Sequence, residues 1–68
     1  GYCLLGTIRG AAGDDASADQ LYRKALYLDP AHREALAHLA LLLESRGSGD
    51  QASVLRTRLR RLGDGDAA

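Results

Sequence analysis

The sequence predicts an all-α fold in which antiparallel helical hairpins follow one another along the chain. Three observations support this prediction. Leu and Ala, which favour helices, supply most apolar residues, whereas Phe, Trp and Met are absent. Apolar residues recur at three- and four-residue spacing, which marks one face of a helix. The chain also matches itself when it is shifted by about 34 residues, so we expect the same structural unit twice.

The first hairpin is expected in about residues 1–32. Its first helix is short, because the apolar pattern of residues 2–12 is followed by a Gly-Asp-Asp turn at 13–15. Its second helix should cover about residues 16–28, where apolar residues again fall at helical spacing. Pro30 prevents a smooth continuation of that helix.

The second hairpin is expected in about residues 33–64. We expect Asp29 to cap its first helix, which would run over about 30–46 and end at a glycine. Asp50 is the expected cap of the last helix. The apolar stripe of that helix stops before residues 63–66, a Gly-Asp-Gly-Asp tail that we expect to fray.

The internal match places large residues on large residues and small residues on small ones. The matching pairs are Tyr2 with Leu36, Leu5 with Leu39, Gly6 with Ala40, Gly13 with Gly47, Ala18 with Ala52, Leu21 with Leu55 and Leu28 with Leu62. Positions that match in size are expected to pack in equivalent surroundings. The period of this match, about 34 residues, is typical of the tetratricopeptide repeat (TPR).

The first repeat resembles the TPR pattern position by position. That pattern has an aromatic residue followed by Leu-Gly, and then small, aromatic, small and Pro positions. The chain has these at Tyr2, Leu5, Gly6, Ala18, Tyr22, Ala25 and Pro30. Arg9 departs from the pattern, as do Arg56 and Leu59 in the last helix. Because terminal repeats are commonly atypical, the second repeat is expected to cap a TPR solenoid.

Two sequence runs are more specific than the general TPR pattern. The runs Ala-Leu-Tyr-Leu-Asp-Pro at 25–30 and His-Leu-Ala-Leu-Leu-Leu-Glu at 38–44 precede an Arg-rich last helix. Together they are similar to the TPR tails of CheR-type chemotaxis protein-glutamate methyltransferases, including the biofilm-associated Wsp-like branch. The resemblance implies a longer protein whose upstream domain transfers a methyl group from S-adenosylmethionine to receptor glutamates.

This resemblance implies a role in which the chain binds protein and carries no cofactor of its own. It would tether a methyl-accepting chemoreceptor or regulate the methyltransferase domain of the same protein. A general scaffold module of a bacterial protein complex remains the alternative. In TPR folds the first helix of each hairpin lines the concave, partner-selecting surface. The residues expected there are Cys3, Thr7, Glu34, Ala37, His38, Leu41 and Glu44.

The residues with catalytic or metal-binding chemistry have simpler interpretations. Cys3 has no base or positive group beside it in the sequence, so a buried or groove-lining thiol is expected and not a nucleophile. His32 and His38 lie on different faces of a helix. Glu34 and His38 are four residues apart, but two ligands do not make a metal site. We therefore expect no catalytic residue and no metal.

A basic stretch lies in the last predicted helix. Its members are Arg56, Arg58, Arg60 and Arg61. They could form a solvated outer face, or they could dock onto an acidic neighbouring domain or partner. Because the formal net charge is zero, nucleic acid is not an expected partner.

Length and composition limit the remaining possibilities. A chain of 68 residues with 46% apolar and 26% charged residues is typical of one small folded domain. No apolar run is long enough for a membrane span, and one cysteine without a signal peptide favours the cytoplasm. The chain starts directly in an apolar segment, so it is expected to be part of a longer protein. Two repeats fall short of the usual three, which predicts self-association or cover by another domain.

Overall fold

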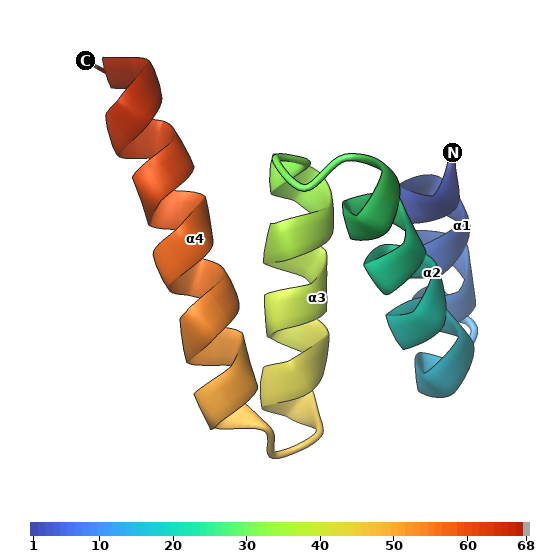
Figure 1. The fold of residues 1–68 in the computed structure, drawn as a ribbon. Helices are drawn as coiled ribbons and strands as arrows, with labels where there is room; N and C mark the ends of the chain where they lie inside the picture. The colour runs from blue at the N-terminus through green and yellow to red at the C-terminus, as the bar shows by residue number, and fades with distance from the viewer. Residues whose placement is uncertain (68) are drawn as a thin grey trace.

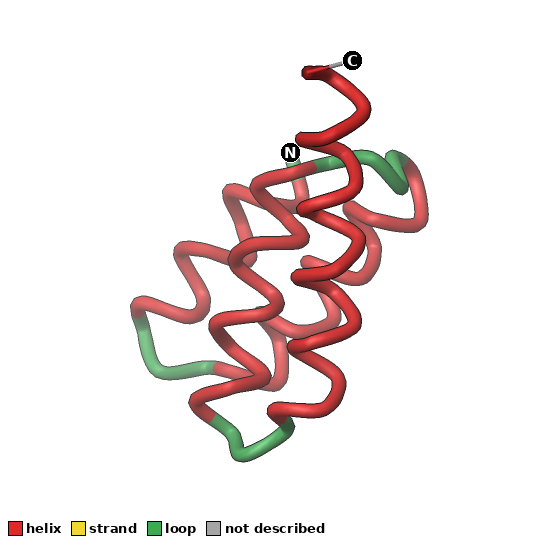
Figure 2. The backbone as a smooth tube through the Cα atoms, turned by 90° about the vertical axis from the view of Figure 1, so that its left-hand side faces the viewer, coloured by secondary structure: helices red, strands yellow, loops and turns green. Residues whose placement is uncertain are grey.

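The structure is a computed structural model that describes the backbone of residues 1–67 and the side chains of residues 1–63. Four helices account for nearly all of this part of the chain: α1 (Tyr2–Ala11), α2 (Asp15–Leu28), α3 (Arg33–Ser45) and α4 (Gly49–Ala67). Figure 1 shows α3 lying between α2 and α4, and Figure 2 shows the loops at alternate ends of the helices. The all-α prediction is confirmed, since the described residues contain no strand.

The two hairpin turns are built in the same way, at equivalent positions of the two repeats. Gly13 and Gly47 have φ angles of 87° and 80°, which is left-handed backbone that favours glycine. In both turns the backbone N–H groups return to carbonyl groups of the preceding helix, as in a Schellman motif. The bonds run from Asp14 to Arg9 and from Gly13 to Gly10 in the first turn, and from Ser48 to Leu43 and from Gly47 to Glu44 in the second.

The start of α3 differs from the sequence prediction. α3 begins at Arg33, and its cap is His32, whose ring Nδ1 accepts the Ala35 N–H. The Asp29 carboxylate instead accepts the Ala31 N–H inside the connecting turn, so it is used before the helix begins. The expectation that Asp29 caps this helix, and that the helix starts at Pro30, was therefore wrong.

α4 also differs from the prediction at both ends. It starts at Gly49, so Asp50 lies in the first helical turn and is not the cap. Its backbone continues as helix to Ala67, and the expected fraying of residues 63–66 was wrong. Gly63 stays in helical backbone and does not adopt the left-handed conformation that follows α1 and α3, so nothing stops the helix there.

The first hairpin closes over a very short distance between α1 and α2. Gly6 of α1 faces the ring of Tyr22, and Ala18 of α2 is fully buried. A methyl group placed on Gly6 would lie 2.7 Å from Cε1 of Tyr22, so a side chain has no room there. In the second hairpin the equivalent residues are Ala40 and Arg56, and the Arg56 side chain is half exposed. The glycine is needed only where the large ring lies opposite.

The two hairpins stack through α2 and α3, and α1 also touches α3 in a smaller contact. The buried core spans both hairpins. Its members are Cys3, Ala18, Tyr22, Ala25, Ala35, Leu39, Ala40, Leu43 and Ala52. The two hairpins are covered unequally, because Leu5 on α1 is 47% exposed whereas its counterpart Leu39 is 1% exposed. No helix of the described residues is long and apolar enough to cross a membrane.

The contact between Gly6 and Tyr22 provides a direct test of the packing. Gly6→Ala would bring Cβ within 2.9 Å of two ring carbons of a side chain that is 5% exposed. Gly10→Ala on the same helix would meet only Ala18 Cβ, at an ordinary 3.7 Å. Because both changes gain the same helix propensity, Gly6→Ala should be less stable than Gly10→Ala by about 1–3 kcal/mol. Urea unfolding followed by far-ultraviolet circular dichroism measures the difference, and equal stability would contradict the packing.

Candidate functional site

The surface that α1 and α3 share contains most of the residues that were predicted to select a partner. From α1 it takes Cys3 and Thr7, and from α3 it takes His38 and Leu41. Thr7, His38 and Leu41 line one open cavity of about 300 Å³, and Tyr22 of α2 lines it as well. Leu41 is 58% exposed, so it offers an apolar contact to a partner. The α1–α3 surface defined by these residues is the candidate binding site.

Two predicted surface residues are placed differently from the others. Ala37 is half-buried, which leaves little of it for a partner to touch. Glu44 pairs with Arg56 of α4 and lines a cleft between α3 and α4. The spacing from His38 to Glu44 corresponds to a rotation of about 120° around the helix. The structure therefore separates Glu44 from the α1–α3 surface.

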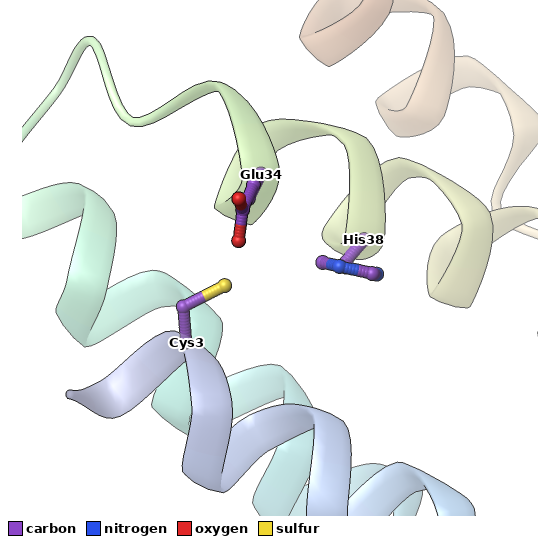
Figure 3. A group of neighbouring side chains, drawn as sticks. All are labelled: Cys3, Glu34 and His38. Carbon is purple, nitrogen blue, oxygen red and sulfur yellow. The ribbon is translucent and has the colours of Figure 1, made fainter.

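Cys3, Glu34 and His38 come together at one end of this surface. Figure 3 shows the three side chains pointing toward one another from α1 and α3. The Cys3 sulfur, a Glu34 carboxylate oxygen and a His38 ring nitrogen all lie within 4.8 Å of one another. Cys3 is buried, Glu34 is exposed and His38 is half-buried. No local pattern indicates this cluster, because Cys3 and Glu34 lie in different repeats and only helix packing joins them.

The surroundings of Cys3 favour the protonated form of its thiol. Burial raises the pKa of Cys3, the negative charge of Glu34 raises it further, and the terminal amino group lowers it. A reactive cysteine needs the opposite, a lowered pKa and a positive neighbour. The prediction of a buried thiol is confirmed, since Cys3 is a free cysteine and is buried.

Tyr22 is the residue of this surface that sequence reasoning assigned to packing alone. Its ring stacks on the His38 ring, with centroids 5.7 Å apart and planes 12° from parallel. Its hydroxyl donates to the Thr7 hydroxyl over 3.3 Å, and Thr7 donates to the Cys3 carbonyl over 3.0 Å. Tyr22 therefore joins α1, α2 and α3 at one point. The sequence indicates this role only through the residue type, because the hydroxyl of a tyrosine at a packed position needs a hydrogen-bond partner.

The four arginines of α4 do not form a single face. Arg56 is held by Glu44, and Arg56 and Arg60 line the same cleft, of about 720 Å³, between α3 and α4. Arg58 donates to the Pro30 carbonyl, which ties α4 to the turn before α3. Arg61 is exposed. Of these four arginines, only Arg56 and Arg60 line the same cleft.

Comparison with known proteins identified two curated relatives. No family model matches the chain, and no solved structure matches it. Over 57 residues, 84% of this chain and 14% of the relative, it is 51% identical to the probable biofilm formation methyltransferase WspC of Pseudomonas aeruginosa. Over 62 residues, 91% of this chain and 15% of the relative, it is 47% identical to the protein of the same name from Pseudomonas putida.

The chain thus spans about one seventh of the length of the curated relatives that it matches. Identity of this level over most of the chain shows common descent with that segment. The resemblance to biofilm-associated methyltransferases, which the sequence predicted, is confirmed at this level. This protein is homologous to a segment of the probable biofilm formation methyltransferases.

Proposed function

We propose that this chain is a pair of TPR repeats that binds a protein partner for a biofilm-associated protein-glutamate methyltransferase of the chemotaxis type. The observation that carries the proposal is the construction of the two hairpins, in which Gly13 and Gly47 close the same Schellman turn at equivalent positions. A period of about 34 residues in helix-turn-helix units is typical of TPR proteins, which present surfaces to partners. The homology to WspC proteins supports the link with a methyltransferase.

The small positions of the TPR pattern have a packing reason in this structure. Gly6 and Ala18 lie at the closest approach of α1 and α2, and Tyr22 fills the space between them and α3. Ala40 and Ala52 are the equivalents in the second hairpin, and each is 1% exposed. These contacts support the TPR interpretation independently of the period.

The chemistry of the longer protein would lie outside this chain. We propose that another region binds S-adenosylmethionine and transfers its methyl group to glutamates of a methyl-accepting chemoreceptor in the cytoplasm. This chain would raise the local concentration of receptor at that region, or would dock on the region and regulate it. No residue of the chain is assigned a part in methyl transfer.

The α1–α3 surface is the better candidate for holding the receptor. Leu41 is exposed beside the stacked rings of Tyr22 and His38. An apolar side chain of a partner that contacts Leu41 would therefore also be covered by these two rings. Apolar and aromatic residues at the centre of a contact carry most of the binding energy in protein interfaces. The cleft with Arg56 and Arg60 is the candidate for an acidic surface of the methyltransferase region.

The test compares binding to two partners. Titration calorimetry would measure the affinity of the chain for the cytoplasmic part of the cognate chemoreceptor and for the methyltransferase region of the longer protein. Leu41→Glu should weaken receptor binding at least tenfold, because a carboxylate would be desolvated in an apolar contact. Val54→Glu makes the same change at an exposed apolar residue of α4 and should leave the affinity unchanged.

The outcomes separate the possible roles. Receptor binding that is lost with Leu41→Glu supports a tether. Binding to the methyltransferase region that is lost when Arg56 and Arg60 become Glu, with no binding to the receptor, would replace the tether by a regulator. Binding to neither partner would contradict the proposal and leave the general scaffold role. Circular dichroism of each variant shows whether the helices remain intact.

The outer face of α1 supports a second proposal, that two copies of this chain associate. Leu4, Leu5 and Ile8 are each about half exposed or more, on a helix of only ten residues. Leu39 is the equivalent of Leu5 in the second repeat, and it is buried in the core between the hairpins. The exposed apolar face of α1 is therefore suited to pack against another surface. We propose that a second copy covers it with its own α1, because symmetric dimers that use the same patch are the commonest assembly.

Sedimentation equilibrium of the 68-residue chain tests this association. The chain should be dimeric at micromolar concentration, and Ile8→Glu should make it monomeric, because two buried carboxylates would face each other. Val54→Glu on α4 should remain dimeric. A folded monomer of the unaltered chain would overturn the proposal, as would a dimer that Val54→Glu disrupts and Ile8→Glu does not.

A further inference from the structure

We propose that Cys3, Glu34 and His38 form a binding site for one zinc ion, which joins α1 to α3 and keeps its fourth coordination position open. The three ligand atoms lie within 4.8 Å of one another. The site shares Cys3 and His38 with the α1–α3 surface, but it does not include Leu41 and does not depend on the identity of any partner. Sequence analysis predicted no metal because Glu34 and His38 alone supply two ligands; the packing of α1 supplies the third.

The chemistry of the three donors fits zinc. Thiolate sulfur, imidazole nitrogen and carboxylate oxygen are the usual zinc ligands, whereas calcium and magnesium prefer oxygen alone. A thiolate and a carboxylate together neutralise the charge of a divalent ion. Three protein ligands with a fourth open position are the arrangement of exchangeable and catalytic zinc sites, not of closed structural ones.

The geometry requires only small movements. In a tetrahedral zinc site the ligand atoms lie roughly 3.3 to 3.8 Å apart, given metal–ligand bonds of about 2.0 to 2.3 Å. The present separation of up to 4.8 Å therefore needs to shorten by about 1 Å. Glu34 and His38 are one helical turn apart on the same face of α3, and the exposed Glu34 side chain is free to approach.

Other contacts already hold two of the ligands in place. The His38 ring is stacked on Tyr22, which limits its rotation. The Tyr22 hydroxyl reaches Thr7, and the Thr7 hydroxyl holds the carbonyl of Cys3 on the first turn of α1. Supporting contacts of this kind orient metal ligands and contribute to metal affinity.

The test uses the reduced 68-residue chain with its N-terminus acetylated, so that the terminal amine cannot bind metal. Addition of Co²⁺ as a probe should produce a near-ultraviolet thiolate-to-cobalt absorption band that saturates at one ion per chain and that Zn²⁺ abolishes. Calorimetry with Zn²⁺ should show one site. Cys3→Ser and Glu34→Gln should each weaken zinc binding more than tenfold, because loss of supporting contacts alone costs about 10- to 100-fold.

Two matched variants serve as controls. His32→Asn keeps a cap for α3 and Asp50→Asn changes an exposed carboxyl group on α4, so both should bind zinc as the unaltered chain does. Glu34 is exposed, so Glu34→Gln leaves the fold intact and keeps the test valid if Cys3→Ser unfolds. Absence of the cobalt band, or zinc affinity that Glu34→Gln leaves unchanged, would overturn the proposal.

Discussion

The fold and the candidate site both depend on the approach of Gly6 to the ring of Tyr22. The ring is buried, and a methyl group on Gly6 would overlap two of its carbon atoms. The same ring also stacks on the His38 ring, and its hydroxyl donates to the Thr7 hydroxyl. A single aromatic side chain therefore sets the distance between α1 and α2 and the position of α3. In the second hairpin no ring takes this place, and the small residue is alanine.

This arrangement explains why the α1–α3 surface has its particular chemistry. Tyr22 stacks on the His38 ring, whose nitrogen lies near Cys3 of α1, and Glu34 of α3 completes the cluster. Leu41, one turn beyond His38, stays exposed on the same surface. The zinc site and the partner contact are therefore adjacent, and metal binding would fix the distance between the two helices that present the partner surface.

Much of the fold could be predicted because its signals repeat. The left-handed glycines Gly13 and Gly47 and the small buried residues recur at equivalent positions of the two repeats, so each half of the chain supports the interpretation of the other. The caps could not be predicted as reliably. Asp29 is a good cap by residue type, but the turn after it uses its carboxylate, and His32 takes the role.

The candidate site was predicted in part, for the same physical reasons. The resemblance to TPR repeats placed Thr7, His38 and Leu41 on one surface, and in the structure they line the same cavity. Spacing within one helix carries no information on what a second helix brings to it, so the proximity of Cys3 to Glu34 and His38 was missed. Glu44 was assigned to the same surface, but it lies around the helix, where Arg56 of α4 pairs with it.

A double-mutant cycle between Gly6→Ala and Tyr22→Leu tests the central packing contact most directly, with the free energy of unfolding as the measured quantity. If the ring is the reason for the glycine, Gly6→Ala destabilises the unaltered chain and is neutral or stabilising in the Tyr22→Leu background. The coupling energy should then be about 1–3 kcal/mol. Additive effects of the two substitutions would show that Tyr22 does not determine the approach of α1 to α2, and the account of both fold and site would fail.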